Sequence, residues 1–170
     1  MNEADILQTL AEVGIALTGF TGIVVAVARR SRGDWTPVEL GQLHDLLWTS
    51  LVVVFFSFLP IVLVRALTPE TTWRLASAAL TLMELVFFSH YWWRGFHFFR
   101  TKTPMPVWGV RIGFIAIPLQ FASVVAKGAV AFGSWLHLAP FIYLASLLLA
   151  LAAAGVNFVY LLLPRGPRAA

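Results

Sequence analysis

Five long apolar segments dominate the sequence, and their length decides what the chain can fold into. They cover about residues 6–28, 44–66, 72–93, 107–129 and 137–163. The hydrocarbon core of a bilayer is about 30 Å thick, so a helix that crosses it needs roughly 20 apolar residues. Each segment reaches that length, and together they leave no room for a separate soluble domain. We therefore predict an all-α integral membrane bundle of five transmembrane helices, with residues 1–170 forming a single domain.

Composition supports this class and excludes others. Apolar residues make up 59% of the chain and charged residues 12%, whereas a soluble domain carries about 25% charged residues. A soluble globule and a disordered chain are both excluded by this balance. Cysteine is absent, which removes disulfides, thiolate metal sites and cysteine nucleophiles.

Proline positions predict where the helices begin and bend. Thr36 to Glu39 form a capping box with Pro37 at the first helical position, so the second helix should begin there. Thr68-Pro69 should start the third helix in the same way. Three further prolines lie in or near spans and predict kinks or wide turns; they are Pro60, Pro118 and Pro140.

The distribution of basic residues predicts the orientation. With five spans, one side of the membrane collects nine of them: Arg29, Arg30, Arg32, Arg94, Arg100, Lys102, Arg111, Arg165 and Arg168. The other side collects three: Arg65, Arg74 and Lys127. The positive-inside rule therefore places the N-terminus outside and the C-terminus in the cytoplasm, as in a multi-pass protein of a bacterial-type inner membrane.

The same arrangement predicts what the basic residues contact. They lie between apolar spans and not on one solvated face, so we expect no nucleic-acid partner. Five arginines on the cytoplasmic side should instead meet headgroups, including those of anionic lipids; they are Arg29, Arg30, Arg32, Arg94 and Arg100.

Small residues at helical spacing predict close helix contacts. In the first span they recur every four residues, as Gly14, Thr18, Gly22 and Ala26, and the fourth span contributes Gly109 and Gly113. Small faces of this kind let helices approach closely in a membrane. The contact is either within the chain or between subunits, so the expected protein partners are further copies of the chain or other membrane subunits.

Polar residues inside the spans predict a candidate site. A polar seam or ion path would include Glu84, Gln120, Asn157 and Lys127, with Thr18 and Ser57 at a depth similar to that of Glu84. A charged Glu84 near the midplane would cost about 2.5–3.5 kcal/mol or more.

Two roles for Glu84 stay open at this point. It could bind a proton or a cation, or it could be a protonated carboxyl that hydrogen-bonds Gln120 or Thr18 and fixes the packing. We expect no basic residue at the depth of Glu84 and hence no buried ion pair there. Glu12 is instead expected to reach Lys127 or Arg65.

Motifs for chemistry are absent from the sequence. It has no Gly-x-Ser-x-Gly, no phosphate-binding loop, no intramembrane aspartate pair and no His-x-x-x-His, so we predict no enzyme, no metal site and no cofactor. A haem b held by His44 and His90 is a geometrically acceptable alternative.

Three functions follow from these patterns. The first is a structural or accessory subunit of a membrane assembly. The second is a homo-oligomeric pore or small transporter that conducts protons, ions or a small solute along the polar seam. The third, which has least support, is a sensor that binds haem or a small ligand.

Overall fold

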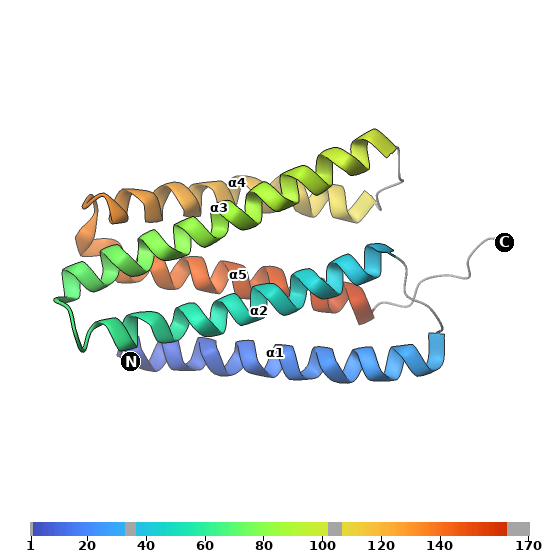
Figure 1. The fold of residues 1–170 in the computed structure, drawn as a ribbon, viewed down its shortest axis with the longest axis horizontal. Helices are drawn as coiled ribbons and strands as arrows, with labels where there is room; N and C mark the ends of the chain where they lie inside the picture. The colour runs from blue at the N-terminus through green and yellow to red at the C-terminus, as the bar shows by residue number, and fades with distance from the viewer. Residues whose placement is uncertain (1, 33–36, 102–106, 163–170) are drawn as a thin grey trace. The chain divides into compact units, whose positions relative to one another are not determined.

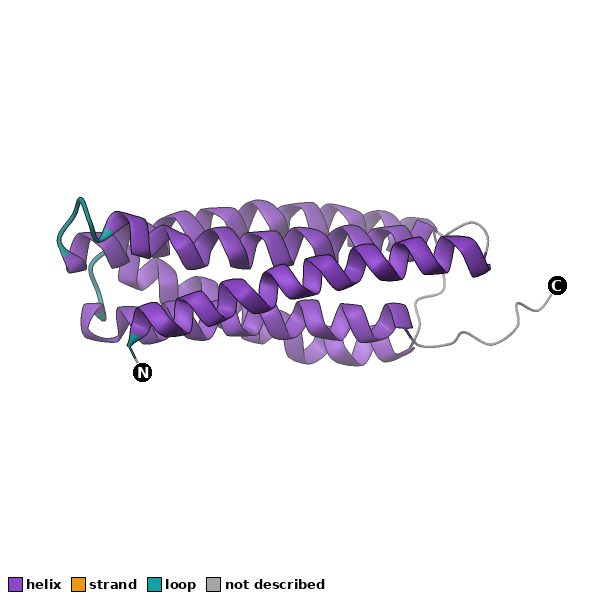
Figure 2. Ribbon diagram, turned by 90° about the horizontal axis from the view of Figure 1, so that it is seen from below, coloured by secondary structure: helices purple, strands orange, loops and turns teal. Residues whose placement is uncertain are grey.

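The structure, a computed structural model, describes residues 2–32, 37–101 and 107–162, with side chains described outside 27–32, 37–39, 90–101, 107–117 and 160. Five α-helices make up almost all of it: α1 (Glu3–Arg32), α2 (Pro37–Leu63), α3 (Pro69–Thr101), α4 (Val107–Ala131) and α5 (Ala139–Leu162) (Figure 1). A short 3-10 helix, η1 (Leu136–Leu138), precedes α5. Figure 2 shows no strand in the described ranges, which confirms the all-α class.

The helix starts predicted from proline positions agree with the structure, whereas two prolines lie inside helices that continue past them. α2 begins at Pro37 and α3 at Pro69, as predicted. The Thr68 hydroxyl oxygen accepts a hydrogen bond from the Thr71 amide at 3.4 Å, so Thr68 caps α3. By contrast, α2 continues through Pro60 and α4 through Pro118 without ending there.

Three of the helices have the length and hydropathy of membrane spans. Within the described part of the chain these stretches are Glu3–Ala26, Leu40–Leu63 and Leu136–Val159, which lie in α1, α2 and η1–α5. A membrane protein is therefore supported, by three such helices and not by five.

The chain divides into two compact units. The first contains residues 1–58 and 147–170, and the second contains residues 59–146. α2 and α5 each contribute to both units, because each helix passes through a boundary.

In the first unit, α1, α2 and the later part of α5 share an apolar core. The core is made of Leu46, Ala154 and Leu161, against which Leu17, Leu43 and Phe158 pack. α1 approaches α2 most closely at Gly14, where an added Cβ would lie 2.8 Å from Val54 Cγ2 and 3.2 Å from the Ser50 carbonyl oxygen. Only a glycine allows this approach without displacing α2.

The second unit contains α3, α4, η1 and the first turns of α5, with α3 and α4 side by side and antiparallel (Figures 1 and 2). α4 ends in a Schellman turn, in which the Ser134 amide bonds the Ala129 carbonyl and the Gly133 amide bonds the Val130 carbonyl, both at 2.9 Å. Gly133 has φ 90° there, a conformation that favours glycine. This turn reverses the chain and brings the start of α5 against α3 and α4.

Candidate functional site

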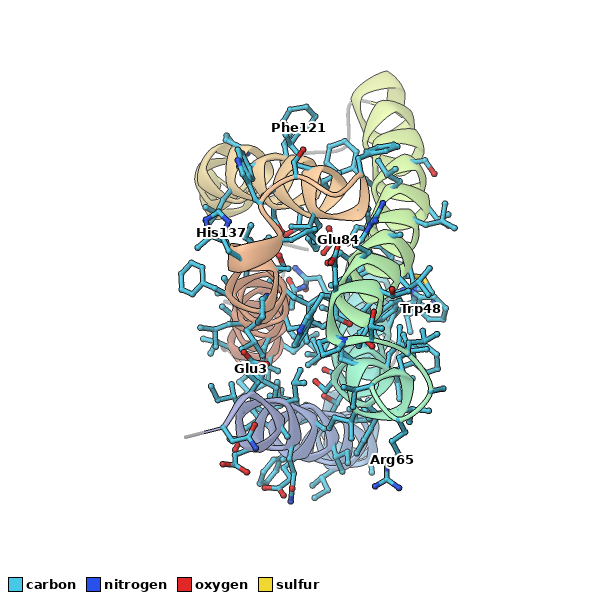
Figure 3. All side chains as sticks on the ribbon, turned by 90° about the vertical axis from the view of Figure 1, so that its left-hand side faces the viewer. Glu3, Trp48, Arg65, Glu84, Phe121 and His137 are labelled. Atoms are coloured by element: carbon cyan, nitrogen blue, oxygen red, sulfur yellow. The ribbon has the colours of Figure 1, made fainter. Side chains whose placement is uncertain are left out.

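An ion pair between α3 and α4 is the most distinctive polar feature of the second unit. Lys127 Nζ lies 2.7 Å from Glu84 Oε2. The lysine side chain is fully buried, and the glutamate side chain is 10% exposed. In Figure 3, Glu84 points from α3 toward α4, whereas Phe121 points outward. Two opposite charges therefore neutralise each other inside the unit.

The prediction that no basic residue reaches Glu84 was wrong. Counted by Cα position, Lys127 lies near the end of α4 and Glu84 well inside α3. Side chains of a helix lean toward its own N-terminus. Because α3 and α4 are antiparallel, Glu84 leans toward Pro69 and Lys127 leans toward Val107, so the two side chains approach each other along the helix axes.

Glu12 makes its described hydrogen bond within α1, and its predicted contact with Lys127 or Arg65, which belong to the other unit, stays a prediction. It is exposed on α1, and its Oε1 accepts a hydrogen bond from Gln8 Nε2 at 2.9 Å. The contact is between neighbouring turns of one helix.

A chain of hydrogen bonds leads from the ion pair to α5. Lys127 Nζ donates to Ser123 Oγ at 2.6 Å, and Ser123 Oγ donates to Ser146 Oγ at 2.9 Å. Ser146 Oγ in turn donates to the Ile142 carbonyl oxygen at 2.7 Å. Every donor in this chain meets an acceptor, so the ammonium is linked to both α4 and α5.

An aromatic contact joins α3 to α5. The rings of Trp73 and Tyr143 pack edge to face, with centroids 5.6 Å apart. Tyr143 is fully buried and close enough to Glu84 for an electrostatic interaction. Trp73 and Glu84 thus mark a face of α3 that is turned toward α4 and α5.

Hydroxyl groups without a partner lie on that face. Among the described residues, Ser77 Oγ and Thr81 Oγ1 are buried and make no hydrogen bond. The same holds for three hydroxyls elsewhere, those of Ser50, Ser57 and Thr72. Buried polar groups are bonded in the large majority of cases, so two unbonded hydroxyls on the face of α3 that carries Glu84 are notable.

The other predicted seam residues are distributed over both units. Gln120 is half-buried on α4 in the second unit. Thr18, Ser57 and Asn157 belong to the first unit. Thr18 Oγ1 donates to the Gly14 carbonyl oxygen of its own helix at 2.9 Å. A continuous seam through all of these residues stays a prediction.

The predicted packing faces differ along α1. Gly14 contacts α2, whereas a Cβ at Gly22 would meet nothing within 4 Å, and Ala26 is exposed. Gly109 and Gly113 fall outside the described side chains.

The predicted lipid and haem residues are mostly beyond what the structure describes. Arg29, Arg30, Arg32, Arg94, Arg100 and His90 lie outside the described side chains. His44 is exposed on α2, with Nδ1 3.8 Å from Asp45 Oδ1. The described residues contain no group of three or more His, Cys, Asp or Glu that could hold a metal ion.

Sequence reasoning gave too little weight to Asp45, Ser123 and Ser146. Asp45 is 8% exposed, and the sequence patterns assigned it no role. Ser123 and Ser146 are small polar residues of the fourth and fifth spans, and neither was among the predicted site residues. An explicit search for polar pairs between antiparallel neighbours, allowing for side-chain lean, would have found both serines.

Comparison with known proteins adds no family. No protein-family model, curated protein or solved structure gives a significant match to this chain.

Proposed function

We propose that this protein acts through helix association, as a structural or accessory subunit of a membrane assembly, and not as an enzyme. The observation that carries the proposal is the ion pair between Glu84 and Lys127. Both charges of the candidate site are used in a contact between helices, and the remaining N–H···O contact of the ammonium leads to α5 through Ser123.

The proposal includes a membrane position for all five helices. α3 and α4 would cross the bilayer together with α1, α2 and α5, with the N-terminus outside and the C-terminus in the cytoplasm. The membrane would be a bacterial-type inner membrane, with arginines at anionic headgroups on the cytoplasmic side. The predicted spans 72–93 and 107–129 support this placement, because each has the roughly 20 residues that a helix needs to cross a bilayer.

In such an environment the ion pair favours one arrangement of α3 and α4. A single charge at the centre of a span is costly, and an unpaired buried charge is more costly than a paired one. Polar side chains also hold transmembrane helices together, since lipid gives no hydrophobic driving force between them. The pair therefore stabilises the helices in the one register that aligns Glu84 with Lys127, and a misplaced neighbour would leave a buried charge unpaired. This property suits a subunit that must assemble in one way with copies of itself or with other subunits.

The proposal is tested by assembly and flux in one set of variants. Glu84→Gln and Lys127→Met each leave one buried group without its partner, and the double variant removes both. We expect native mass spectrometry in mild detergent to show an assembly for the wild type and the double variant, and none for either single variant. Proteoliposomes containing the wild type and the double variant should show the same background proton and cation flux.

One observation favours the pore or transporter alternative: the unbonded hydroxyls of Ser77 and Thr81 on the face of α3 that carries Glu84. Under that alternative, a variant that still assembles would change flux. A Glu84→Gln protein with wild-type assembly and abolished flux would replace the subunit proposal with the transporter.

A further inference from the structure

The face of α3 that carries Glu84 is fixed by contacts on both sides. Trp73 packs on Tyr143 of α5, and Glu84 pairs with Lys127 of α4. Ser77 and Thr81 lie between these two contacts along the helix. At 3.6 residues per turn, Ser77, Thr81 and Glu84 fall within an arc of about 60°. Their oxygens therefore share the side of α3 that faces α4 and α5.

The two polar contacts of the lysine ammonium are with oxygen atoms. It contacts Glu84 Oε2 at 2.7 Å and Ser123 Oγ at 2.6 Å. Ser77 is fully buried, and its hydroxyl, like that of Thr81, has no partner among the described residues. A carboxylate with several hydroxyls is the type of oxygen-rich environment that hard cations prefer. The charged groups facing this point are Glu84 from α3 and Lys127 from α4, and Tyr143 is the titratable group from α5.

Lys127 is tethered to α4 and bonds neither of the two hydroxyls. Its ammonium is held on a four-carbon stem from α4, and it uses Glu84 and Ser123. Lys127 lies four positions before Ala131, the last residue of α4. Long basic side chains near a helix end can extend to the membrane surface, so the same lysine has an outward alternative to its buried position.

We propose that Glu84, Ser77, Thr81 and Ser123 form a binding site for a monovalent cation, whose resident occupant is the ammonium of Lys127. A free cation and the lysine compete for the same oxygens. When a free cation binds, it is balanced by Glu84 and also uses the hydroxyls of Ser77 and Thr81, while Lys127 moves outward. This activity goes beyond the proposed role in helix association and does not depend on it.

The first experiment measures competition in the intact protein. The chain has two lysines, Lys102 and Lys127, so Lys102→Arg leaves Lys127 as its only lysine. Acylation of Lys127 is followed by peptide mass spectrometry in sodium, potassium or choline chloride at equal ionic strength. We expect at least a twofold faster acylation in sodium or potassium than in choline, and no cation dependence in Glu84→Gln. Equal rates in all three salts would overturn the proposal.

The second experiment removes the resident cation. Lys127→Ala lacks four side-chain atoms, which propylammonium matches in size and charge. We expect propylammonium to raise the thermal midpoint of this variant saturably, by about 5–10 °C at a hundred times its dissociation constant. Propan-1-ol has nearly the same shape without the charge, and tetramethylammonium has the charge without N–H donors, so neither should raise it.

Two further variants identify the ligands. In the Lys127→Ala background, Glu84→Gln should abolish the response to propylammonium, and Ser77→Ala with Thr81→Val should weaken its affinity at least threefold. A response to propan-1-ol of equal size, or one that survives Glu84→Gln, would show simple cavity filling and would contradict a cation site. If Lys127→Ala does not assemble, the competition experiment on the intact protein decides alone.

Discussion

Breaking one half of the ion pair should destabilise the protein far more than removing both halves. In Glu84→Gln the ammonium of Lys127 loses the carboxylate 2.7 Å away. In Lys127→Met the carboxylate is left with no counter-charge. The double variant Glu84→Gln/Lys127→Met replaces both groups by neutral side chains of similar size.

The geometry sets the magnitude. At 2.7 Å and an effective dielectric constant of about 20, the attraction between unit charges is about 6 kcal/mol. Desolvation of the two ions offsets most of it, at several kcal/mol per ion. We therefore expect each single variant to lower the free energy of unfolding by about 3–5 kcal/mol, and the double variant to lie close to the wild type. Because the two single losses sum to about 6–10 kcal/mol while the double variant loses little, the resulting coupling energy is about 6–10 kcal/mol.

The assay is equilibrium unfolding in mixed micelles by SDS titration, followed by tryptophan fluorescence. Glu12→Gln is the matched control, because Glu12 is an exposed glutamate that contacts only Gln8 of its own helix among the described residues. It should change the unfolding free energy by less than about 0.5 kcal/mol. Additive effects of the two single variants would refute the reasoning, since an ion pair at contact distance cannot be energetically uncoupled.

The remaining predictions concern glycines and use open positions as controls. Gly14→Ala should destabilise the protein by about 1–3 kcal/mol because the new Cβ overlaps α2. Gly22→Ala, whose new Cβ meets nothing within 4 Å, should be neutral or stabilising by up to about 1 kcal/mol. The same SDS titration compares the two variants, and equal effects would contradict the close approach of α1 and α2 at Gly14. Gly133→Ala should lower the thermal midpoint, because about 1–2 kcal/mol of backbone strain arises at φ 90°. Gly128→Ala, where a Cβ meets nothing within 4 Å, should leave the thermal midpoint unchanged. A Gly133→Ala protein with an unchanged midpoint would mean that this turn is not held in a left-handed conformation.

Helix placement was largely predictable because apolar length and proline position act locally. Pro37 and Pro69 start their helices as expected, since each occupies a first turn where no amide donor is needed. Pro60 and Pro118 were less informative, because the neighbouring turns of a long helix keep their own hydrogen bonds and the helix continues past the proline.

The site was predictable by residue type but not by partner. Glu84 and Lys127 were both placed in the predicted polar seam, but no basic residue was expected at the depth of Glu84. A lysine side chain spans several ångströms, and its lean along an antiparallel helix adds to that reach. Sequence spacing on one helix also cannot show that Ser123 bonds Ser146, because that contact depends on the rotation of α4 relative to α5.

The most direct test of the central claim is a nitrogen–carbon dipolar recoupling measurement by solid-state NMR in lipid bilayers. Lys102→Arg protein is labelled with ¹⁵N at lysine Nζ and ¹³C at glutamate Cδ, so that the lysine signal comes from Lys127 alone. The account predicts strong dephasing of this signal, as for an ammonium in direct contact with a carboxylate, together with its loss in Glu84→Gln and its persistence in Glu12→Gln. A Lys127 signal that shows no dephasing, or that is unchanged in Glu84→Gln, would contradict the ion pair on which the account depends.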